Sequence, residues 1–425
     1  MNMTPLSGSN KIVVVGGGAA GMMAAGMAAQ AGAQVTLLEQ NGRLGKKLLI
    51  TGKGRCNVTN DCPWQDVLQS VPTNPRFLYS ALAGFSPADA KSFFERYGCA
   101  LKTERGNRVF PVSDRSQSVL DALERFLRAY HVRILPRRAA EIAVSDGRVT
   151  GVKTAEGPVP ADCVILATGG LSYPATGSTG SGYAMARALG HTIIEPTGSL
   201  VPLVEKGHDC AKMQGLALKN IAIRLVNAKG KTVYEDFGEL LFTHFGLSGP
   251  VILSASAHMA RGEDGYTLKI DLKPALDEKT LDARILRDFS AAQNRDFENS
   301  LSALLPRSMI PVVIARSGID PMQKVNSITK QQRRALLETI KCFSVSIACK
   351  APVEDAIVTS GGVKVSEVNA KTMESKLVQG LYFAGELLDV DAYTGGFNLQ
   401  IAWATGRLAG MSAAAKEFQK PEDAT

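Results

Sequence analysis

The sequence predicts an α/β protein in which a parallel sheet with glycine-rich turns is split by antiparallel strands and by helices. Residues 11–39 combine a β-branched strand, a glycine-rich turn, a small-residue helix and a second strand. Residues 163–170 and 380–386 repeat the pattern of an apolar run that ends in a glycine turn. Between them, residues 195–273 alternate apolar and polar side chains, and residues 275–341 carry leucine and isoleucine at helical spacing. We therefore expect the parallel sheet to resume after an insertion.

The first unit predicts a dinucleotide site. Gly16, Gly18 and Gly21 have the G-x-G-x-x-G spacing between a strand and a helix, and Glu39 ends the second strand. The glycines allow a tight turn, a close approach of the backbone to a pyrophosphate, and close packing of helix on strand. The helix N-terminus offers free N–H groups to phosphates, and Glu39 can accept hydrogen bonds from ribose hydroxyls.

Two other interpretations of this unit are a glycine-rich turn without a ligand and a membrane span. Residues 12–38 carry no charge, but six glycines interrupt the run and no signal-peptide cleavage site follows it. No other uncharged apolar run reaches membrane-spanning length. We therefore expect a cytoplasmic protein without a membrane segment.

Composition excludes several other classes of protein. The chain has 425 residues, 45% of them hydrophobic and 21% charged, which is typical of a globular protein with two or three domains. Seven cysteines without a C-x-x-C motif favour neither a disulfide framework nor a zinc site. Five histidines are widely spaced. We therefore expect no metal site.

Positive charge is concentrated in two segments of a chain whose net charge is +8. Residues 41–60 contain five Lys or Arg and no acid, and residues 101–140 contain nine Lys or Arg against four acids. Such segments can bind cofactor phosphates, an anionic substrate or nucleic acid. A solvated basic surface explains the second segment equally well.

Local patterns predict the remaining elements. Residues 41–60 are expected to form a long functional loop that is neither helix nor strand. Residues 75–97 and 116–130 are expected to be helical, and residues 132–167 to form a small meander. Residues 195–273 are expected to form a small antiparallel barrel, to which residues 341–350 add a further strand. A helix rich in small residues is expected to end near Lys416.

Several motifs occur in an order that resembles a known family. They are the fingerprint and the segments at residues 52–60, 167–174, 176–183, 238–244, 359–363, 385–391 and 395–399. Over residues 11–412 the chain resembles the bacterial FAD-dependent oxidoreductases related to aminoacetone oxidase and the bile-acid-inducible flavoproteins. The resemblance implies a Rossmann-like FAD-binding domain of glutathione-reductase type, split by a small β-barrel and a helical insert. The implied boundaries are 1–194 and 357–425 for the FAD-binding domain, 195–274 and 342–356 for the barrel, and 275–341 for the insert.

The resemblance also implies that FAD binds at the fingerprint. Ala19 and Ala20 would offer backbone N–H groups to the pyrophosphate, and Lys46 and Lys47 would lie near the ribose or phosphates unless they are merely exposed. Residues 52–57 would pass beside the isoalloxazine ring.

Other contacts are implied for the far end of the cofactor. Gly396, Asn398 and Leu399 would present N–H groups at a helix start to flavin N1 and O2, where reduction builds negative charge. The backbone of Ala140 would pair with adenine. The complete implied set is Gly16, Gly18, Ala19, Ala20, Gly21, Glu39, Gly45, Lys46, Lys47, Gly52, Gly54, Arg55, Cys56, Asn57, Ala140, Thr168, Gly169, Gly385, Glu386, Asp389, Gly396, Asn398 and Leu399.

In such an enzyme hydride moves through flavin N5, and the protein orients the substrate and supplies a proton. Candidate proton donors are Cys56 and His244, with Tyr173 and Tyr393 as weaker candidates. Residues 177–182 are glycine-rich but do not follow a β-branched strand, so we expect no second nucleotide domain. NAD(P)H could still reduce the flavin transiently.

Three functions stay open at this point. The first is an FAD-dependent oxidoreductase for a small amine or an unsaturated metabolite. The second is reduction of uridine to dihydrouridine in ribosomal RNA, which would use the basic segment at residues 101–140. The third is a flavin-binding redox sensor without turnover. The oligomeric state is not predicted.

Overall fold

The computed structural model describes residues 10–260 and 264–416, apart from the side chain of Asp355. The described residues form two compact units. One contains the chain up to Ser199 and again from Val353, and the other is Leu200–Pro352. The five finer boundaries given above stay a prediction.

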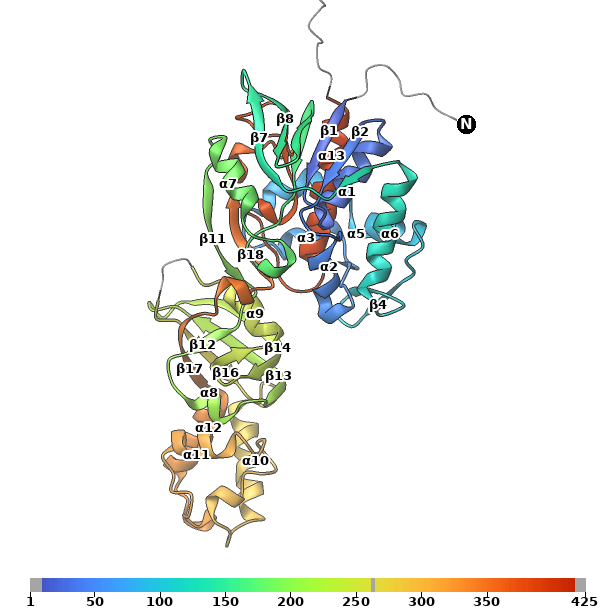
Figure 1. Ribbon diagram of the computed structural model, residues 1–425. Helices are drawn as coiled ribbons and strands as arrows, with labels where there is room; N and C mark the ends of the chain where they lie inside the picture. Colours follow the sequence, from blue (N-terminus) through green and yellow to red (C-terminus); the bar gives the residue numbers. More distant parts are fainter. Residues whose placement is uncertain (1–9, 261–263, 417–425) are drawn as a thin grey trace, which may run out of the picture. The chain divides into compact units, whose positions relative to one another are not determined.

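A five-stranded parallel sheet forms the core of the first unit (Figure 1). Its order is β19 (Leu381–Phe383), β10 (Cys163–Leu166), β1 (Lys11–Val15), β2 (Gln34–Leu38) and β6 (Arg133–Leu135), and every neighbouring pair is parallel. The inner strands are buried on both faces, which explains their nearly continuous apolar sequences. The predicted return of the sheet after an insertion is confirmed.

Two small-residue helices pack side by side against this sheet. They are α1 (Ala19–Gln30) and α13 (Phe397–Ala414), labelled together in Figure 1. A Cβ added at Gly406 would lie 2.4 Å from the Ala20 carbonyl oxygen, and one added at Gly410 would lie 2.3 Å from that of Ala24. Glycine therefore allows the two backbones to touch, and the last helix of the chain completes the first unit.

Three smaller sheets complete the strands of the first unit. They are β3 (Thr59–Asn60), β5 (Arg108–Pro111) and β4 (Leu101–Glu104); β7 (Ala139–Ser145), β8 (Arg148–Thr154) and β9 (Gly157–Pro160); and β11 (Ile193–Ser199) with β18 (Val358–Val363). The predicted meander is thus β7–β8–β9, while β6 and β10 belong to the parallel sheet. Residues 195–199 were expected in the barrel, but β11 pairs with β18 instead.

The second unit contains a closed six-stranded barrel and a group of helices. The barrel order is β12 (Leu203–Glu205), β15 (Gly246–Ser248), β14 (Thr232–Phe242), β13 (Ala217–Val226), β16 (Thr267–Asp271) and β17 (Phe343–Lys350). The helices are α8 (Asp209–Lys212), α9 (Pro250–Ser256), α10 (Glu278–Ser290), α11 (Ile310–Ser317) and α12 (Lys330–Lys341). The predicted barrel and the helical region at residues 275–341 are both present, although Lys341 ends α12 rather than beginning the last strand.

Two local predictions need correction. Residues 75–97 are not one helix, because α4 (Tyr79–Gly84) ends before a new N-cap at Ser86, and α5 (Pro87–Arg96) then begins with a capping box. Residues 41–60 are not without regular structure, because they contain α2 (Lys46–Ile50), one 3₁₀ turn and β3.

The remaining helices of the first unit are α3 (Trp64–Gln69), α6 (Ser116–Ala129), which matches the helix predicted there, and α7 (Ser181–Ala188). The short 3₁₀ turns are Thr51–Gly54, Pro75–Leu78, Pro174–Thr176, Phe297–Asn299, Val325–Ser327, Val353–Asp355, Val365–Glu367 and Gly385–Leu387. Within residues 10–260 and 264–416, no helix is both long and apolar enough to cross a bilayer.

Candidate active site

The fingerprint glycines meet the geometric demands of a nucleotide turn. Gly16 has φ +105°, and an added Cβ would lie 2.5 Å from the Ala167 carbonyl oxygen. A Cβ at Gly21 would lie 1.8 Å from the Gly16 carbonyl oxygen. Glycine at position 16 therefore lets the end of β1 lie beside the Ala167 carbonyl, and glycine at position 21 lets α1 lie against the end of β1.

Gly18 differs from the other two, because nothing lies within 4 Å of the position of its Cβ. It is the N-cap of α1, which has no side-chain cap and no acid in its first turn. The N–H groups at the start of a helix carry a partial positive charge and have no partner inside the helix. The open space in front of Gly18, Ala19 and Ala20 suits an anion such as a pyrophosphate.

Glu39 is buried and already braces this turn. Its Oε2 accepts a hydrogen bond from the Gly17 N–H at 2.8 Å, and its Oε1 accepts one from the Asn41 N–H at 2.7 Å. The side chain is 8% exposed. Because a carboxylate oxygen has more than one lone pair, Glu39 can serve the turn and also accept from a ribose hydroxyl.

The next segment is tied to the fingerprint through Gly45. Its N–H donates to the Gly17 carbonyl at 2.9 Å, and its φ of +64° starts α2. Lys46 is exposed and donates from Nζ to Asn41 Oδ1 at 3.0 Å.

Lys47 instead joins a half-buried polar network. Its Nζ lies 2.6 Å from Glu386 Oε2 and 2.6 Å from Ser172 Oγ. The Ser172 hydroxyl and the Thr359 N–H both donate to Glu386 Oε1, at 2.9 and 2.8 Å. Burial disfavours the ionised form of Glu386, but the Lys47 ammonium and these hydrogen bonds outweigh it and hold the pKa of the carboxyl below its ordinary value.

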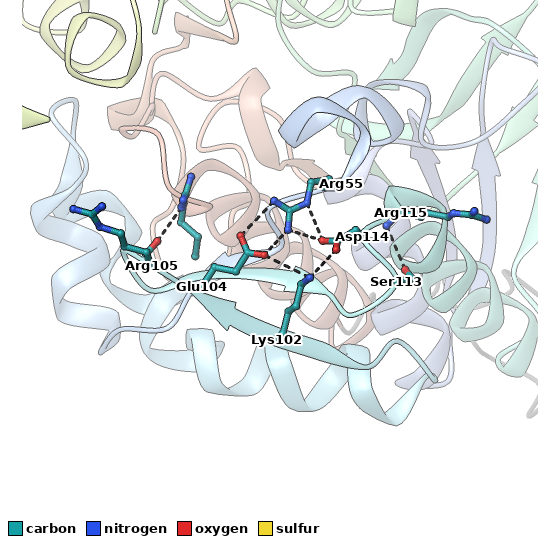
Figure 2. Close-up of polar contacts among 8 residues, drawn as sticks. Arg55, Lys102, Glu104, Arg105, Ser113, Asp114 and Arg115 are labelled. Carbon is teal, nitrogen blue, oxygen red and sulfur yellow. Dashed lines mark hydrogen bonds and ion pairs between the residues drawn. The ribbon is translucent and has the colours of Figure 1, made fainter. Parts of the chain in front are cut away.

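The loop after α2 has an unusual backbone. Gly52, Lys53, Gly54 and Cys56 all have positive φ, between +56° and +82°. Left-handed conformations cost energy for residues other than glycine and tend to occur at functional sites. Arg55 fixes the loop by ion pairs with Glu104 and Asp114 (Figure 2). Its guanidinium lies 4.1 Å from the centre of the Phe110 ring.

Cys56 and Asn57 follow in this loop. The Cys56 side chain is completely buried, and that burial raises the pKa of its thiol to about 12. A thiol that is buried and so weakly acidic has the properties of a core residue. In the described part of the chain, the buried Oδ1 of Asn57 has no hydrogen-bond partner.

The start of α13 lies against β3. Gly396, with φ +100°, is its N-cap, and a Cβ there would lie 2.4 Å from the Thr59 carbonyl oxygen. Asn398 braces the preceding turn, because its side chain accepts from the Ala392 N–H at 2.9 Å and donates to the Ala392 carbonyl at 2.7 Å. No side chain caps the helix, so the first-turn N–H groups up to Leu399 are available to a ligand.

Glycine turns follow two other strands of the sheet. Thr168 and Gly169 come after β10, and Gly385 comes after β19, where its N–H donates to Thr405 Oγ1 at 3.0 Å. Among the described residues, the buried Thr168 Oγ1 has no hydrogen-bond partner. Because β1, β10 and β19 are neighbouring parallel strands, Gly16, Thr168 and Gly385 all leave the same edge of the sheet.

Two further predicted contacts have distinct surroundings. The ladder between β7 and β8 shifts register between Ala139 and Glu141, so Ala140 is the bulged residue, as suits a backbone that pairs with a base. Asp389 is buried, and its carboxylate and carbonyl oxygens both accept from Asn74 Nδ2, at 3.0 and 2.8 Å.

These observations fit an FAD molecule. The open space at Gly18, the uncapped starts of α1 and α13, and two buried polar atoms without a partner, on Asn57 and Thr168, all lie on segments that the sequence assigned to the cofactor. Among the described residues, no group of three His, Cys, Asp or Glu side chains could hold a metal ion.

The candidate proton donors are not all in the same unit. Cys56, Tyr173 and Tyr393 belong to the first unit, where the Tyr393 N–H donates to the Ser70 carbonyl at 3.0 Å. His244 belongs to the second unit, between β14 and β15, and it is exposed with its ring 5.0 Å from that of Phe245.

Three residues of this region were missed as individual contacts. All three lie within motifs that the sequence singled out: Ser172 at residues 167–174, Thr359 at residues 359–363 and Asn60 at residues 52–60. The side-chain amide of Asn60 donates to both the Gly106 and Gly395 carbonyls at 3.1 Å. Nothing in the local sequence indicates that pair of contacts.

Comparison with known proteins agrees with this geometry. Residues 10–412 match a family model described as "HI0933-like protein Rossmann domain". The chain is 35% identical to the 3-dehydro-bile acid Δ(4,6)-reductase of Clostridium scindens over 410 residues, which is 95% of this chain and 99% of that protein.

Two other similar proteins have a different named substrate. The chain is 31% identical to the ribosomal RNA dihydrouridine synthase of Escherichia coli over 396 residues, which is 92% of this chain and 95% of that one. It is 30% identical to the protein of the same name from Haemophilus influenzae, over 94% of this chain and 97% of that one. Among solved structures, an Escherichia coli quinol fumarate reductase aligns over 95% of this chain and 70% of that chain with a TM-score of 0.50 and 16% identity, a likeness of fold alone.

Proposed function

The chain belongs to the HI0933-like Rossmann family of FAD-dependent oxidoreductases, and we propose that it reduces a carbon–carbon double bond conjugated to a carbonyl group. The names of its relatives support this choice. A Δ(4,6)-reductase and a dihydrouridine synthase act on molecules of very different size. Each reaction adds a hydride and a proton across a polarised double bond. That shared chemistry is the reaction we propose for this chain.

The observation that carries the proposal is the set of backbone N–H groups at the edge of the parallel sheet. The start of α1 would hold the FAD pyrophosphate, with Glu39 on the ribose and the bulge at Ala140 on the adenine. The start of α13 would face the flavin end, where its N–H groups stabilise negative charge. When bound, FAD supplies the hydride from N5. NAD(P)H is the proposed reductant.

His244 is the proposed proton donor on the strength of the sequence motif at residues 238–244. The other candidate, Cys56, is a poor acid, because burial raises the pKa of its thiol to about 12. Hydride addition at the carbon β to the carbonyl leaves an electron pair that is delocalised to the carbonyl oxygen. Protonation at the α carbon then completes a two-electron reduction and gives the saturated carbonyl compound.

An anaerobic titration of the FAD-loaded protein tests the proposal. NADH or NADPH should bleach the flavin band, and a 3-oxo-Δ4 steroid or uridine-containing RNA should restore it with formation of one equivalent of saturated product. Failure of both acceptors to restore the band would overturn the proposal, and bleaching by an amine alone would assign amine oxidation instead. Turnover with either acceptor would exclude a redox sensor that only binds flavin.

Uridine in ribosomal RNA is the second candidate substrate, and the charge of the first unit favours it. Arg105, Arg108 and Arg115 are exposed, and none has an acidic partner among the described residues (Figure 2). A bile acid has at most one carboxylate to offer them, whereas RNA has a phosphate at every nucleotide. Mass spectrometry of RNA treated with the reduced enzyme, which should gain two hydrogens per modified uridine, separates this candidate from a small enone.

A further inference from the structure

We infer that the tip of the β4–β5 hairpin, Arg105 to Arg108, is the phosphate-binding element that holds single-stranded RNA beside the active site. The inference rests on the second candidate substrate above and adds the place of contact. The strands are β4 and β5, and the connecting residues Arg105, Gly106 and Asn107 are all exposed.

The hairpin tip is fixed to the predicted flavin end of the site by Asn60. The buried side-chain amide of Asn60 donates at 3.1 Å both to the Gly106 carbonyl in the tip and to the Gly395 carbonyl just before α13. The two carbonyl oxygens therefore lie no farther apart than twice that distance. Arg105 and Asn107 flank Gly106, so the cationic tip borders the turn from which α13 starts.

The strand next to the hairpin is rigidly attached to the same helix. Thr59 Oγ1 donates to Gln400 Oε1 at 2.8 Å, and Trp403 Nε1 donates to the Val58 carbonyl at 2.9 Å. All four of these side chains or backbone groups are buried. Because β3 pairs with β5 through Thr59 opposite Val109 and Asn60 opposite Arg108, α13 fixes the position of the arginines.

Charge pairing around the hairpin leaves its tip positive. Glu104 and Asp114 are both engaged by Arg55, at 2.5 Å each, and Asp114 also by Lys102 at 2.7 Å (Figure 2). Glu104 and Asp114 are therefore paired inside a local network, and Asp61, whose N–H donates to the Asn107 carbonyl at 2.7 Å, is paired with Lys91 at 2.9 Å. Arg108 Nε donates to the Arg105 carbonyl at 3.0 Å, which holds its guanidinium beside the tip.

The chemistry of the tip matches a polyanion better than a steroid. Its exposed residues are Arg105, Gly106, Asn107 and Arg108, and none of them presents an apolar side chain. The planar guanidinium group of arginine can donate two parallel hydrogen bonds to phosphate oxygens. A base must leave its stack to reach a buried reaction centre. The tip would hold the phosphates that flank such a base.

The test compares RNA binding by three variants of the FAD-loaded full chain. The probe is a labelled oligouridylate, and its Kd is measured by fluorescence anisotropy over a series of salt concentrations. The variants are R105Q/R108Q, the charge-conserving R105K/R108K, and the control K364Q/K371Q, which removes two exposed lysines of the same unit. FAD content and melting temperature verify that each variant folds.

R105Q/R108Q should weaken binding on the order of tenfold and reduce the slope of log Kd against log salt by about 1.4, because each phosphate contact with a single strand contributes about 0.7. K364Q/K371Q should bind as the original chain does, and R105K/R108K should keep the salt slope of the original chain, because its charge is unchanged. Equal losses in R105Q/R108Q and K364Q/K371Q, or no binding by the original chain at low salt, would overturn the inference. A loss of RNA affinity in R105Q/R108Q alone would support the inference, even if no uridine is reduced. Uridine reduction by a chain whose RNA affinity does not fall in R105Q/R108Q would overturn the inference and leave the proposed function intact.

Discussion

Lys47 and Glu386 lie 339 positions apart in the chain, yet Lys47 Nζ is 2.6 Å from Glu386 Oε2. Both side chains are 21% exposed, so the pair is shielded from water but not sealed from it. Glu386 accepts three hydrogen bonds in all, from the Lys47 ammonium, the Ser172 hydroxyl and the Thr359 N–H. The pair therefore ties the segment after the fingerprint to the turn after β19.

We predict that Glu386→Gln lowers the free energy of unfolding at neutral pH by about 1–3 kcal/mol, between the values for exposed and buried pairs. The pKa of Glu386 in the folded protein lies below its ordinary value of 4.5, so its contribution is present above that pH and is lost as the pH falls through the folded-state pKa. The difference between the variant and the original chain should thus shrink in acid. Urea unfolding at several pH values measures it.

The control for this prediction is Glu141→Gln, which breaks an ion pair with Lys153 whose side chains are 58% and 57% exposed. It should change stability by less than about 0.5 kcal/mol. Equal effects of the two substitutions would show that the Lys47 pair is no more than a surface contact.

The fingerprint allows a prediction that separates ligand binding from folding. Gly18 has φ −82° and open space at its Cβ position, so Gly18→Ala should fold with unchanged stability. If the pyrophosphate occupies that space, the added methyl should weaken FAD binding tenfold or more, which is about 1.4 kcal/mol. Gly21→Ala should instead destabilise the fold itself, because its Cβ would lie 1.8 Å from the Gly16 carbonyl oxygen.

Fluorescence titration with FAD and thermal melting measure the two effects separately. Gly42→Ala is the matched control, because Gly42 is exposed and nothing lies within 4 Å of its Cβ position. Normal FAD affinity in Gly18→Ala would refute the placement of the pyrophosphate at α1.

How well the sequence predicted the fold depended on how local each signal was. Gly21 is required by a contact within one βαβ unit, with the Gly16 carbonyl, and the glycine spacing of that unit was enough to identify the turn. The break at Ser86 was also local, since Ser86 and Asp89 form a capping box that a search for caps would have found. In contrast, β11 resembles a barrel strand and was misassigned, because its partner β18 lies far along the chain.

The parts of the site that the sequence could not predict likewise depend on tertiary contacts. The sequence placed Lys47 and Glu386 near the cofactor, but their mutual pairing depends on two turns meeting at one edge of the sheet. Cys56 was a reasonable candidate acid because it lies in the flavin loop. Its backbone φ of +60° and its burial in the core are properties of the folded loop, which composition could not reveal.

Buried thiols predict sensitivity to alkali. Burial raises the pKa of Cys99 to about 11 and that of Cys163 to about 12, from an ordinary value of 9.0. Each group favours folding fully below pH 9, and its contribution is lost as the pH rises toward its folded-state pKa, by about 1.4 kcal/mol per pH unit. The urea midpoint should therefore fall steadily above about pH 9.

Cys99→Ala should make that decline shallower, although it lowers stability at neutral pH by removing a buried side chain. The exposed Cys349 supplies the control, since Cys349→Ala should leave the slope unchanged. If neither substitution alters the slope between about pH 8 and pH 10, thiol ionisation does not govern alkaline stability.

The proposed proton donor gives the last prediction. His244→Gln should slow reoxidation of the reduced flavin by the unsaturated substrate by about 10²-fold or more, the usual contribution of a general acid, while reduction by NAD(P)H keeps its rate. His208→Gln is the matched control, because His208 is an exposed histidine of the same unit. Stopped-flow absorbance measures the two half-reactions separately. Equal rates in the two variants would remove His244 from the mechanism and return the search to Tyr173 and Tyr393.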